Sequence, residues 1–196
     1  MLTLRALSTV RYSFRRLTPD DLDLVNGWIL APHVAQWWVD ADGPAEPIGL
    51  EDFDEPDFRM WLVMHDGVPF AYMQDYDPHL YPGHHFADRP APARGIDQFI
   101  GVADMVGKGH GSAFIRQRAA ELFDEGAVVV VTDPHPSNGR AIRAYEKAGF
   151  IPYGEGNHPQ WWPQPADGLH LLIPPQLFIR RPKRVSRITP TDRLTS

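Results

Sequence analysis

The chain has 196 residues, of which 43% are hydrophobic, a size that accommodates one well-buried domain and is short for two. It contains no cysteine, which excludes disulfides, thiolate metal sites and cysteine nucleophiles, and no apolar run approaches the roughly 18 residues that a membrane span needs. Because no continuous apolar segment lies near its start, the sequence favours a cytoplasmic protein without a secretory signal.

The net charge of −6 is unevenly distributed. Residues 180–196 hold six basic side chains against Asp192 alone, so this tail carries +5 and the rest of the chain −11. Residues 40–57 contain eight acids and no lysine or arginine. An acidic body disfavours nucleic acid and favours a cationic ligand, while a solvated acidic loop would have the same composition. We expect one domain over 10–178, a flexible basic tail over 179–196, and no nucleic-acid or membrane partner.

The first half of the chain predicts a strand, helices and a hairpin. Thr18 and Pro19 precede a periodic apolar pattern, as an N-cap and first helical residue do. Asp66-Gly67 joins two apolar runs, which is a strong hairpin signal. The predicted elements are a strand at 11–17, a helix at 18–30, a short helix or turn at 32–38, and a hairpin over 58–76.

The second half alternates strands and helices after a Pro-rich loop at 77–94. The predicted elements are a strand at 95–102, a helix from the glycine cluster to about 123, a strand at 127–132, a helix at 138–147 ended by Gly149, and a strand at 168–173. Such alternation around a hairpin predicts an α/β fold, with a mixed central sheet flanked by helices.

Three glycines at 107, 109 and 111 open the helix that follows the predicted strand at 95–102. A glycine loop at a helix start exposes main-chain N–H groups at the positive end of the helix dipole, which suits a phosphate. The spacing fits neither a Walker loop, which needs Gly-Lys-Ser/Thr, nor a G-x-G-x-x-G dinucleotide fingerprint.

Val106–Gly111 resembles the pyrophosphate loop of GNAT-fold acyl-CoA transferases, [Arg/Gln]-x-x-Gly-x-[Gly/Ala], except at Val106. Downstream, "NGRAIRAYEKAGF" resembles the family signature N-x-x-A-x-x-x-Y-[EK]-[KR]-x-G-F. The segments "RGIDQFI", "GKGHG", "TDPHPSNGRAIRAYEKAGF", "HVAQWW" and "MQDY" are similar to those of aminoglycoside 6'-N-acetyltransferases. The resemblance implies the GNAT acyl-CoA N-acyltransferase fold, acetyl-CoA as co-substrate, and direct transfer of acetyl to a primary amine, foremost the 6'-amine of an aminoglycoside.

The resemblance gives two residues catalytic roles. It implies that Asp97 accepts the proton of the amine, directly or through water, or positions the ammonium. It implies that Tyr145 gives a proton to the departing thiolate. The alternatives are a strand-end aspartate in a turn contact and a core aromatic at helical spacing.

The cofactor is expected to contact main-chain groups of the glycine loop and the start of the following signature helix. Asn138 can cap that helix, and the resemblance implies that it also touches the pantetheine arm. Lys108 and His110 either add charge near the phosphates or are exposed loop residues. The predicted cofactor-binding residues are Ile100, Val106, Gly107, Lys108, Gly109, His110, Gly111, Ser112, Asn138, Ala141 and Tyr145.

The acceptor site is expected to combine carboxylates for a polycation with aromatic faces for sugar rings. The predicted substrate-binding residues are Trp37, Trp38, Gln74, Asp75, Tyr76, Asp97, Gln98 and Asp133. Core packing of the tryptophans and a turn role for Asp133 are the alternatives. Trp161 and Trp162 could cover the cleft or the sheet. His79, His84 and His85 share one loop without regular ligand spacing, so no metal is predicted.

Two rival functions remain at this level. A GNAT enzyme could act on another amine, such as a polyamine, a siderophore precursor or a protein N-terminus. A GNAT-fold protein could also bind acyl-CoA without turnover, which the presence of both Asp97 and Tyr145 disfavours. Either a monomer or a homodimer is compatible with the sequence.

Overall fold

The structure is a computed structural model that describes residues 12–40, 43–44, 46–156 and 168–174. Trp161, Trp162, the basic tail and the domain limits at 10 and 178 lie outside these residues, so what the sequence predicts for them stays a prediction. Within the described ranges, no helix combines the length and apolar character that crossing a membrane requires.

The helices are α1 (Leu22–Ile29), α2 (Pro32–Ala35), α3 (His110–Asp124) and α4 (Gly139–Ala148). The strands are β1 (Ser13–Arg16), β2 (Val39–Asp40), β3 (Gly43–Pro44), β4 (Arg59–His65), β5 (Val68–Tyr76), β6 (Ala93–Ile100), β7 (Val129–Thr132), β8 (Ile151–Gly156) and β9 (Gly168–Ile173). Short 3₁₀ turns lie at Pro19–Asp21, Glu51–Phe53, Pro78–Leu80 and Ala103–Met105.

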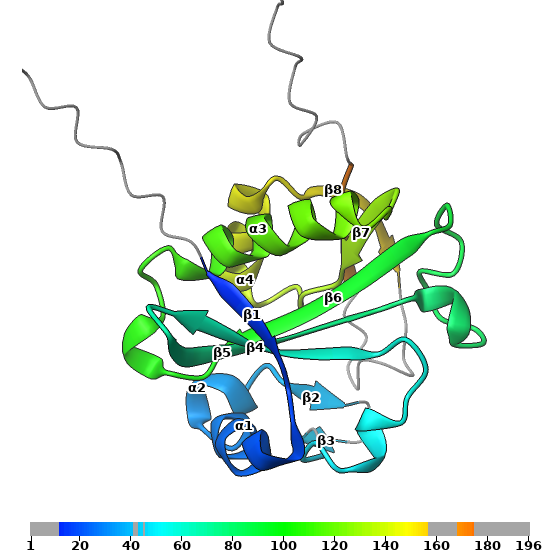
Figure 1. The fold of residues 1–196 in the computed structure, drawn as a ribbon. Helices are drawn as coiled ribbons and strands as arrows, with labels where there is room; N and C mark the ends of the chain where they lie inside the picture. The colour runs from blue at the N-terminus through cyan, green and yellow to red at the C-terminus, as the bar shows by residue number, and fades with distance from the viewer. Residues whose placement is uncertain (1–11, 41–42, 45, 157–167, 175–196) are drawn as a thin grey trace, which may run out of the picture.

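Seven strands form one sheet in the order β1-β4-β5-β6-β7-β9-β8, and β2 pairs with β3 separately. The β6–β7 pair is parallel and the other pairs are antiparallel, which confirms the predicted mixed sheet. Figure 1 shows α3 and α4 on one face of this sheet and α1 and α2 on the other. Each face therefore has its own core.

The two cores come from opposite sides of the same strands. Phe114 and Ile115 of α3 pack with Met73 of β5 on one face. Val25 of α1 packs with Tyr72 on the other. Because side chains alternate along a strand, the β5 residues from Ala71 to Tyr76 point alternately toward α3 (odd numbers) and α1 (even numbers). Phe70 departs from this pattern beside an irregularity in the β4–β5 register and packs with Phe114 of α3.

The predicted hairpin and helix ends are present. Asp66 and Gly67 both have positive φ, at 51° and 78°, as a two-residue hairpin turn requires. The Asn138 carboxamide oxygen accepts the Ala141 N–H at 3.1 Å and caps α4, and Gly149 ends that helix with φ 109°.

Several elements differ from the sequence-based expectation. The helix expected from residue 18 begins as the 3₁₀ turn Pro19–Asp21, where the Asp21 carboxylate accepts both the N–H and the hydroxyl of Thr18. The strand expected at 95–102 is shifted two residues toward the N-terminus. The sequence-based expectation has no counterpart of β8, an edge strand that holds Pro152, and a sheet edge is where a proline can be accommodated in a strand.

Candidate active site

A cleft of about 1170 Å³ opens where β6 and β7 separate. The two strands pair only from Ala93 to Gly95 with residues 129–131, although β6 continues to Ile100. Ligands of open α/β sheets bind outside the carboxyl ends of such strands. Asp97 and Gln98 from β6, and Thr132 at the end of β7, line this cleft.

Asp97 lies in the cleft within a short hydrogen-bonded chain. The Gln74 amide donates to the Asp97 carboxylate at 3.0 Å, and the Tyr72 hydroxyl donates to the Gln74 carbonyl oxygen at 2.9 Å. Burial, and then the charge of Asp133, raise the pKa of Asp97 to about 7, while the hydrogen bond from Gln74 opposes the shift. The carboxyl group can therefore take up or release a proton near neutral pH.

Tyr145 reaches the cleft from α4 and is almost fully buried. Burial, followed by the charge of Asp97, raises the pKa of the Tyr145 hydroxyl, and hydrogen bonds with Thr132 and Gln98 oppose this in part. The hydroxyl therefore keeps its proton at neutral pH and can donate it. The centroid of its ring lies 5.3 Å from that of the Phe150 ring, so Tyr145 is also part of the hydrophobic core.

The glycine loop lies at the N-terminus of α3, on the same cleft. Gly107 and Gly109 have φ of 77° and 89°, backbone conformations that residues other than glycine rarely adopt. At Gly111 a methyl group would lie 3.8 Å from Ile100, in ordinary contact. The predicted cofactor-binding residues that line the cleft are Ile100, Val106, Gly107, Gly109, Gly111, Ser112, Asn138, Ala141 and Tyr145.

Lys108 and His110 differ from this group, since neither lines the cleft. The His110 imidazole Nδ1 lies 2.8 Å from the Tyr12 hydroxyl, and its ring packs 4.9 Å from that of His65. The imidazole therefore contacts Tyr12 and His65 instead of lining the cleft, while the His110 N–H is part of the helix N-terminus. Its expected role near the phosphates stays a prediction. Lys108 is an exposed loop residue.

On the acceptor side, the predicted residues that line the cleft are Trp37, Trp38, Gln74, Tyr76, Asp97, Gln98 and Asp133. The ring centroids of Trp38 and Phe99 lie 4.9 Å apart, so Trp38 also contributes to the core behind the cleft. The Tyr76 ring occupies space that a side chain at residue 95 would fill. A Cβ on Gly95 would lie 2.3 Å from this ring, so glycine is required there.

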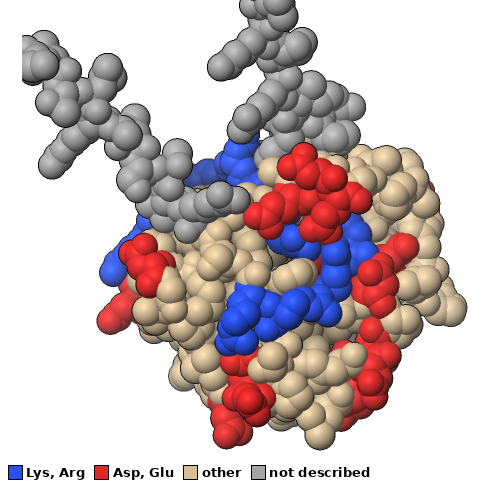
Figure 2. Space-filling view, in the orientation of Figure 1, with Lys and Arg blue, Asp and Glu red and all other residues tan. Residues whose placement is uncertain are grey.

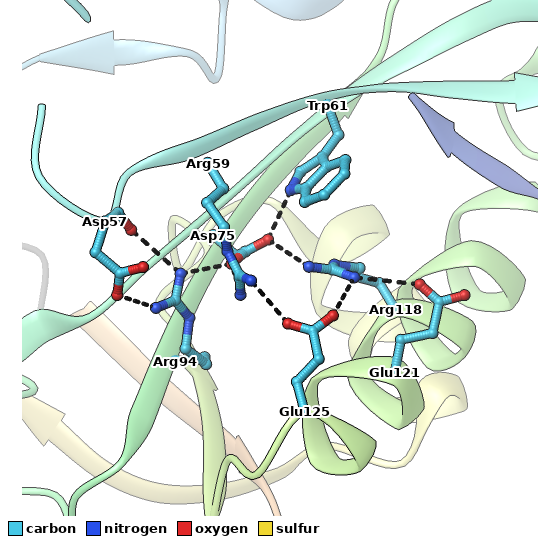
Figure 3. A network of polar contacts seen from close by, with 8 residues as sticks. All are labelled: Asp57, Arg59, Trp61, Asp75, Arg94, Arg118, Glu121 and Glu125. Carbon is cyan, nitrogen blue, oxygen red and sulfur yellow. Dashed lines mark hydrogen bonds and ion pairs between the residues drawn. The ribbon is translucent and has the colours of Figure 1, made fainter. Parts of the chain in front are cut away.

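The prediction that Asp75 binds the acceptor was wrong. Asp75 is 0% exposed and points to the α3 side of the sheet (Figure 3). Its carboxylate accepts hydrogen bonds from Arg59 at 2.6 Å, Arg94 at 2.6 Å and Arg118 at 3.1 Å, and from the Trp61 indole at 2.7 Å.

The ionic network around Asp75 extends to the surface. Arg118 and Arg59 also pair with Glu125, at 3.0 and 2.7 Å, and Arg94 pairs with Asp57. Figure 2 shows acidic and basic side chains adjacent to one another on one face of the molecule. Asp57 thus belongs to this network, so only part of the acidic stretch at 40–57 can serve the cleft.

The cleft is lined by a set of acidic residues, which the sequence located only to the stretch at 40–57, and by a set of basic residues, which were not identified from the sequence. The acids from the stretch at 40–57 that line it are Glu46, Glu51, Asp52 and Glu55. The basic residues are Arg140, Arg143 and Lys147 of α4. The three basic residues are spaced three and four positions apart, which puts them on one face of α4. This spacing is visible in the sequence and could have identified them. Among the described residues, no group of three or more histidine, aspartate or glutamate side chains is placed to hold a metal.

The sequence matches the acetyltransferase (GNAT) domain over residues 18–158. Aminoglycoside N(6')-acetyltransferase type 1 of Klebsiella pneumoniae is 31% identical over 146 residues, which cover 70% of this chain and 73% of that protein. The structure of AAC(6')-Ib in complex with parmomycin and acetyl-CoA superposes with a TM-score of 0.75 at 28% identity, covering 88% of this chain and 98% of that one. The structure of AAC(6')-Ib in complex with coenzyme A and kanamycin superposes with a TM-score of 0.73 at 28% identity, covering 86% of this chain and 97% of that one. Because the domain match spans well over half of the sequence, the chain belongs to the GNAT acetyltransferase family.

Proposed function

We propose that the protein transfers the acetyl group of acetyl-CoA directly to the 6'-amino group of aminoglycosides. The observation that carries this proposal is the charge pattern of the cleft. Four acids from residues 46–55, together with Asp133, suit a polycationic acceptor, and three basic residues of α4 suit an anionic cofactor. Relatives named as aminoglycoside 6'-N-acetyltransferases support the same reading.

The residues present fit acetyl-CoA. The main-chain N–H groups at the start of α3 suit its pyrophosphate, and the edge of β6 beyond Gly95 offers peptide groups that β7 does not pair. Acetyl-CoA supplies the thioester. Arg140, Arg143 and Lys147 provide positive charge for its phosphates.

Asp97 and Tyr145, which line the same cleft, carry out the two proton transfers. The Asp97 carboxylate takes the proton that the amine nitrogen loses when it forms the amide bond. The Tyr145 hydroxyl, which stays protonated, donates to the sulfur as the carbon–sulfur bond breaks. No protein nucleophile is needed, in keeping with a chain that lacks cysteine.

The acceptor is tested by steady-state acetylation of paired aminoglycosides. We expect turnover with a kanamycin-type substrate that has a 6'-amine and none with one that has a 6'-hydroxyl. Equal acetylation of both would place the reactive amine elsewhere on the sugar. Binding of acetyl-CoA without acetylation of either would contradict the aminoglycoside assignment.

Gly109→Val should weaken acetyl-CoA binding by about tenfold or more, because valine cannot adopt φ 89° without displacing the loop N–H groups. Gly126→Val is the matched control. Gly126 also has positive φ and open space around it, and it lies at the other end of α3. Calorimetry should show lost affinity only in the Gly109 variant. Equal affinity in both folded variants would contradict the assignment of the loop.

A further inference from the structure

The end of β6 carries a main-chain carbonyl that points away from β5. The Gly101 N–H donates to the Phe70 carbonyl of β5 at 2.9 Å. Gly101 N–H and Ile100 C=O belong to one trans peptide unit, in which the two groups point in opposite directions. The Ile100 carbonyl therefore points to the other edge of β6, the edge that β7 leaves after Gly95.

This open edge of β6 faces the cleft with several peptide groups. Successive residues of an antiparallel strand direct their peptide groups to opposite edges. The Ile100 N–H and both peptide groups of Gln98 therefore face the same edge as the Ile100 carbonyl. Both residues line the cleft. The pantetheine arm of acetyl-CoA contains amide groups, which can pair with a strand edge of this kind.

His33 of α2 is the hydrogen-bond partner of the Ile100 carbonyl. Its Nε2 lies 3.0 Å from the carbonyl oxygen. Because a carbonyl oxygen can only accept, Nε2 is the donor and carries a proton. His33 itself is half-buried and lines the cleft. The imidazole thus does at Ile100 what a backbone N–H of a neighbouring strand does elsewhere in the sheet.

The helix that carries His33 lies against both branches of the fork where β6 and β7 separate. His33 contacts β6, and the Trp37 ring, just after α2, has its centroid 5.8 Å from that of His135, which follows β7. Val34, next to His33, is buried in the core on the α1 side of the sheet. These contacts give α2 a defined position, from which His33 reaches Ile100.

We propose that His33 is a positioning residue for acetyl-CoA, which donates its Nε2–H to the Ile100 carbonyl and holds the open edge of β6 where the pantetheine arm requires it. This inference rests on the proposed function only in placing acetyl-CoA along β6, and it does not depend on which amine is acetylated. Without the donor, the carbonyl would turn toward water or another donor, and the peptide groups beside it would turn with it. A cofactor that binds only the ordered edge then loses affinity in proportion to the fraction of molecules that keep it.

The binding test compares two replacements of His33 by calorimetry with coenzyme A. His33→Phe keeps a ring without a donor, whereas His33→Gln keeps an amide N–H close to the position of Nε2. His33→Phe should raise Kd about tenfold, as when about one molecule in ten keeps the ordered edge, and His33→Gln should restore most of the loss. Gln36→Ala, an exposed position at the end of the same helix, is the control and should change Kd less than about twofold. An unchanged Kd in His33→Phe, or equal losses in His33→Phe and His33→Gln, would overturn the inference.

A fragment of the cofactor separates the strand edge from the glycine loop. The compound 3'-phosphoadenosine 5'-diphosphate has the phosphates of coenzyme A and no pantetheine arm. Its Kd should agree within about twofold between the parent protein and His33→Phe, because the N–H groups at the start of α3 are unchanged. Equal losses for the fragment and for coenzyme A would show that the substitution disturbs the glycine loop or the packing as a whole, and the inference would fail.

Two further results keep the inference distinct from the proposed function. In ¹⁵N-labelled protein without ligand, NMR of the imidazole nitrogens should show a proton on His33 Nε2. An Nδ1–H tautomer would overturn the inference even if the enzyme acetylates aminoglycosides, since Nε2 would then have no proton to donate. If no aminoglycoside is acetylated while His33→Phe loses affinity for coenzyme A and not for the fragment, the proposed acceptor is wrong and the role of His33 is upheld.

Discussion

Asp97→Asn should lower kcat for aminoglycoside acetylation by about 100-fold or more, the usual contribution of one acid–base group. The pKa of Asp97, raised to about 7 by burial and by the charge of Asp133, makes the parent enzyme lose activity as the pH falls below 7. An amide cannot take up the proton, so the variant should lose this limb of the pH profile. Steady-state rates between pH 5.5 and 8.5 measure both effects.

Asp97→Asn should also stabilise the folded protein. A loss of kcat in this variant could then not be attributed to unfolding. The pKa of Asp97 is higher in the folded protein than the value of about 3.9 in an unfolded chain, so the folded state binds the proton more tightly. Below pH 4 the Asp97 carboxyl group is protonated in both the folded and the unfolded state, so its ionisation does not lower the free energy of unfolding. Above pH 7 the folded state bears the whole cost of the buried charge. Asp97→Asn should therefore raise the melting temperature at pH 8 and change it little at pH 4.

Binding of acetyl-CoA provides the control for Asp97→Asn. Calorimetry should give an affinity within about threefold of the parent, because the loop at the start of α3 is unchanged. A folded variant that acetylates at the parent rate would show that Asp97 is neither the proton acceptor nor the group that positions the amine.

Asp75→Asn should lower the free energy of unfolding by about 3–5 kcal/mol, the usual loss when one partner of a buried ion pair is removed. Three arginines and the Trp61 indole donate to this carboxylate, and the neutral amide offers them one oxygen and a repelling NH₂ group (Figure 3). Urea unfolding measures the change. At about 2–4 °C per kcal/mol for a domain of this size, the melting temperature should fall by roughly 10 °C.

Asp66→Asn is the matched control for this prediction. Asp66 is 91% exposed in the hairpin turn, and asparagine tolerates its positive φ. We expect a change within about 0.5 kcal/mol there. Equal stability of the two variants would show that the arginines around residue 75 find other partners or water.

Much of the fold could be predicted because its signals are local. The Asp66-Gly67 turn, the glycines before α3 and the Asn138 cap each depend on the conformation of a few neighbouring residues. The cleft follows from the same signals, since the strand that carries Asp97 leads directly into the glycine loop.

What could not be predicted depends on contacts distant in the sequence. Nothing near Asp75 indicates that Arg118, 43 residues later, will reach it from α3. Strand alternation does exclude one part of the prediction, because Gln74 and Tyr76 share a face that Asp75 cannot share. The contact between His85 and Asp133 joins a Pro-rich loop to the end of β7, and no sequence pattern marks it.

The position of Asp75 also bears on how the chain selects its strand pairing. If β5 slipped by one residue against its neighbours, every side chain would change face. Asp75 would then turn toward α1, and Gln74 or Tyr76 would stand among three arginines in place of the carboxylate that they share. Glu125 and Asp57 at the edge of the network would be their remaining acidic partners. Because such a mispaired sheet would remove the buried carboxylate that all three arginines share, the network acts against the wrong register as well as for the right one. The pairing that keeps Asp75 with its arginines is the pairing that brings Gln74 to Asp97 in the cleft.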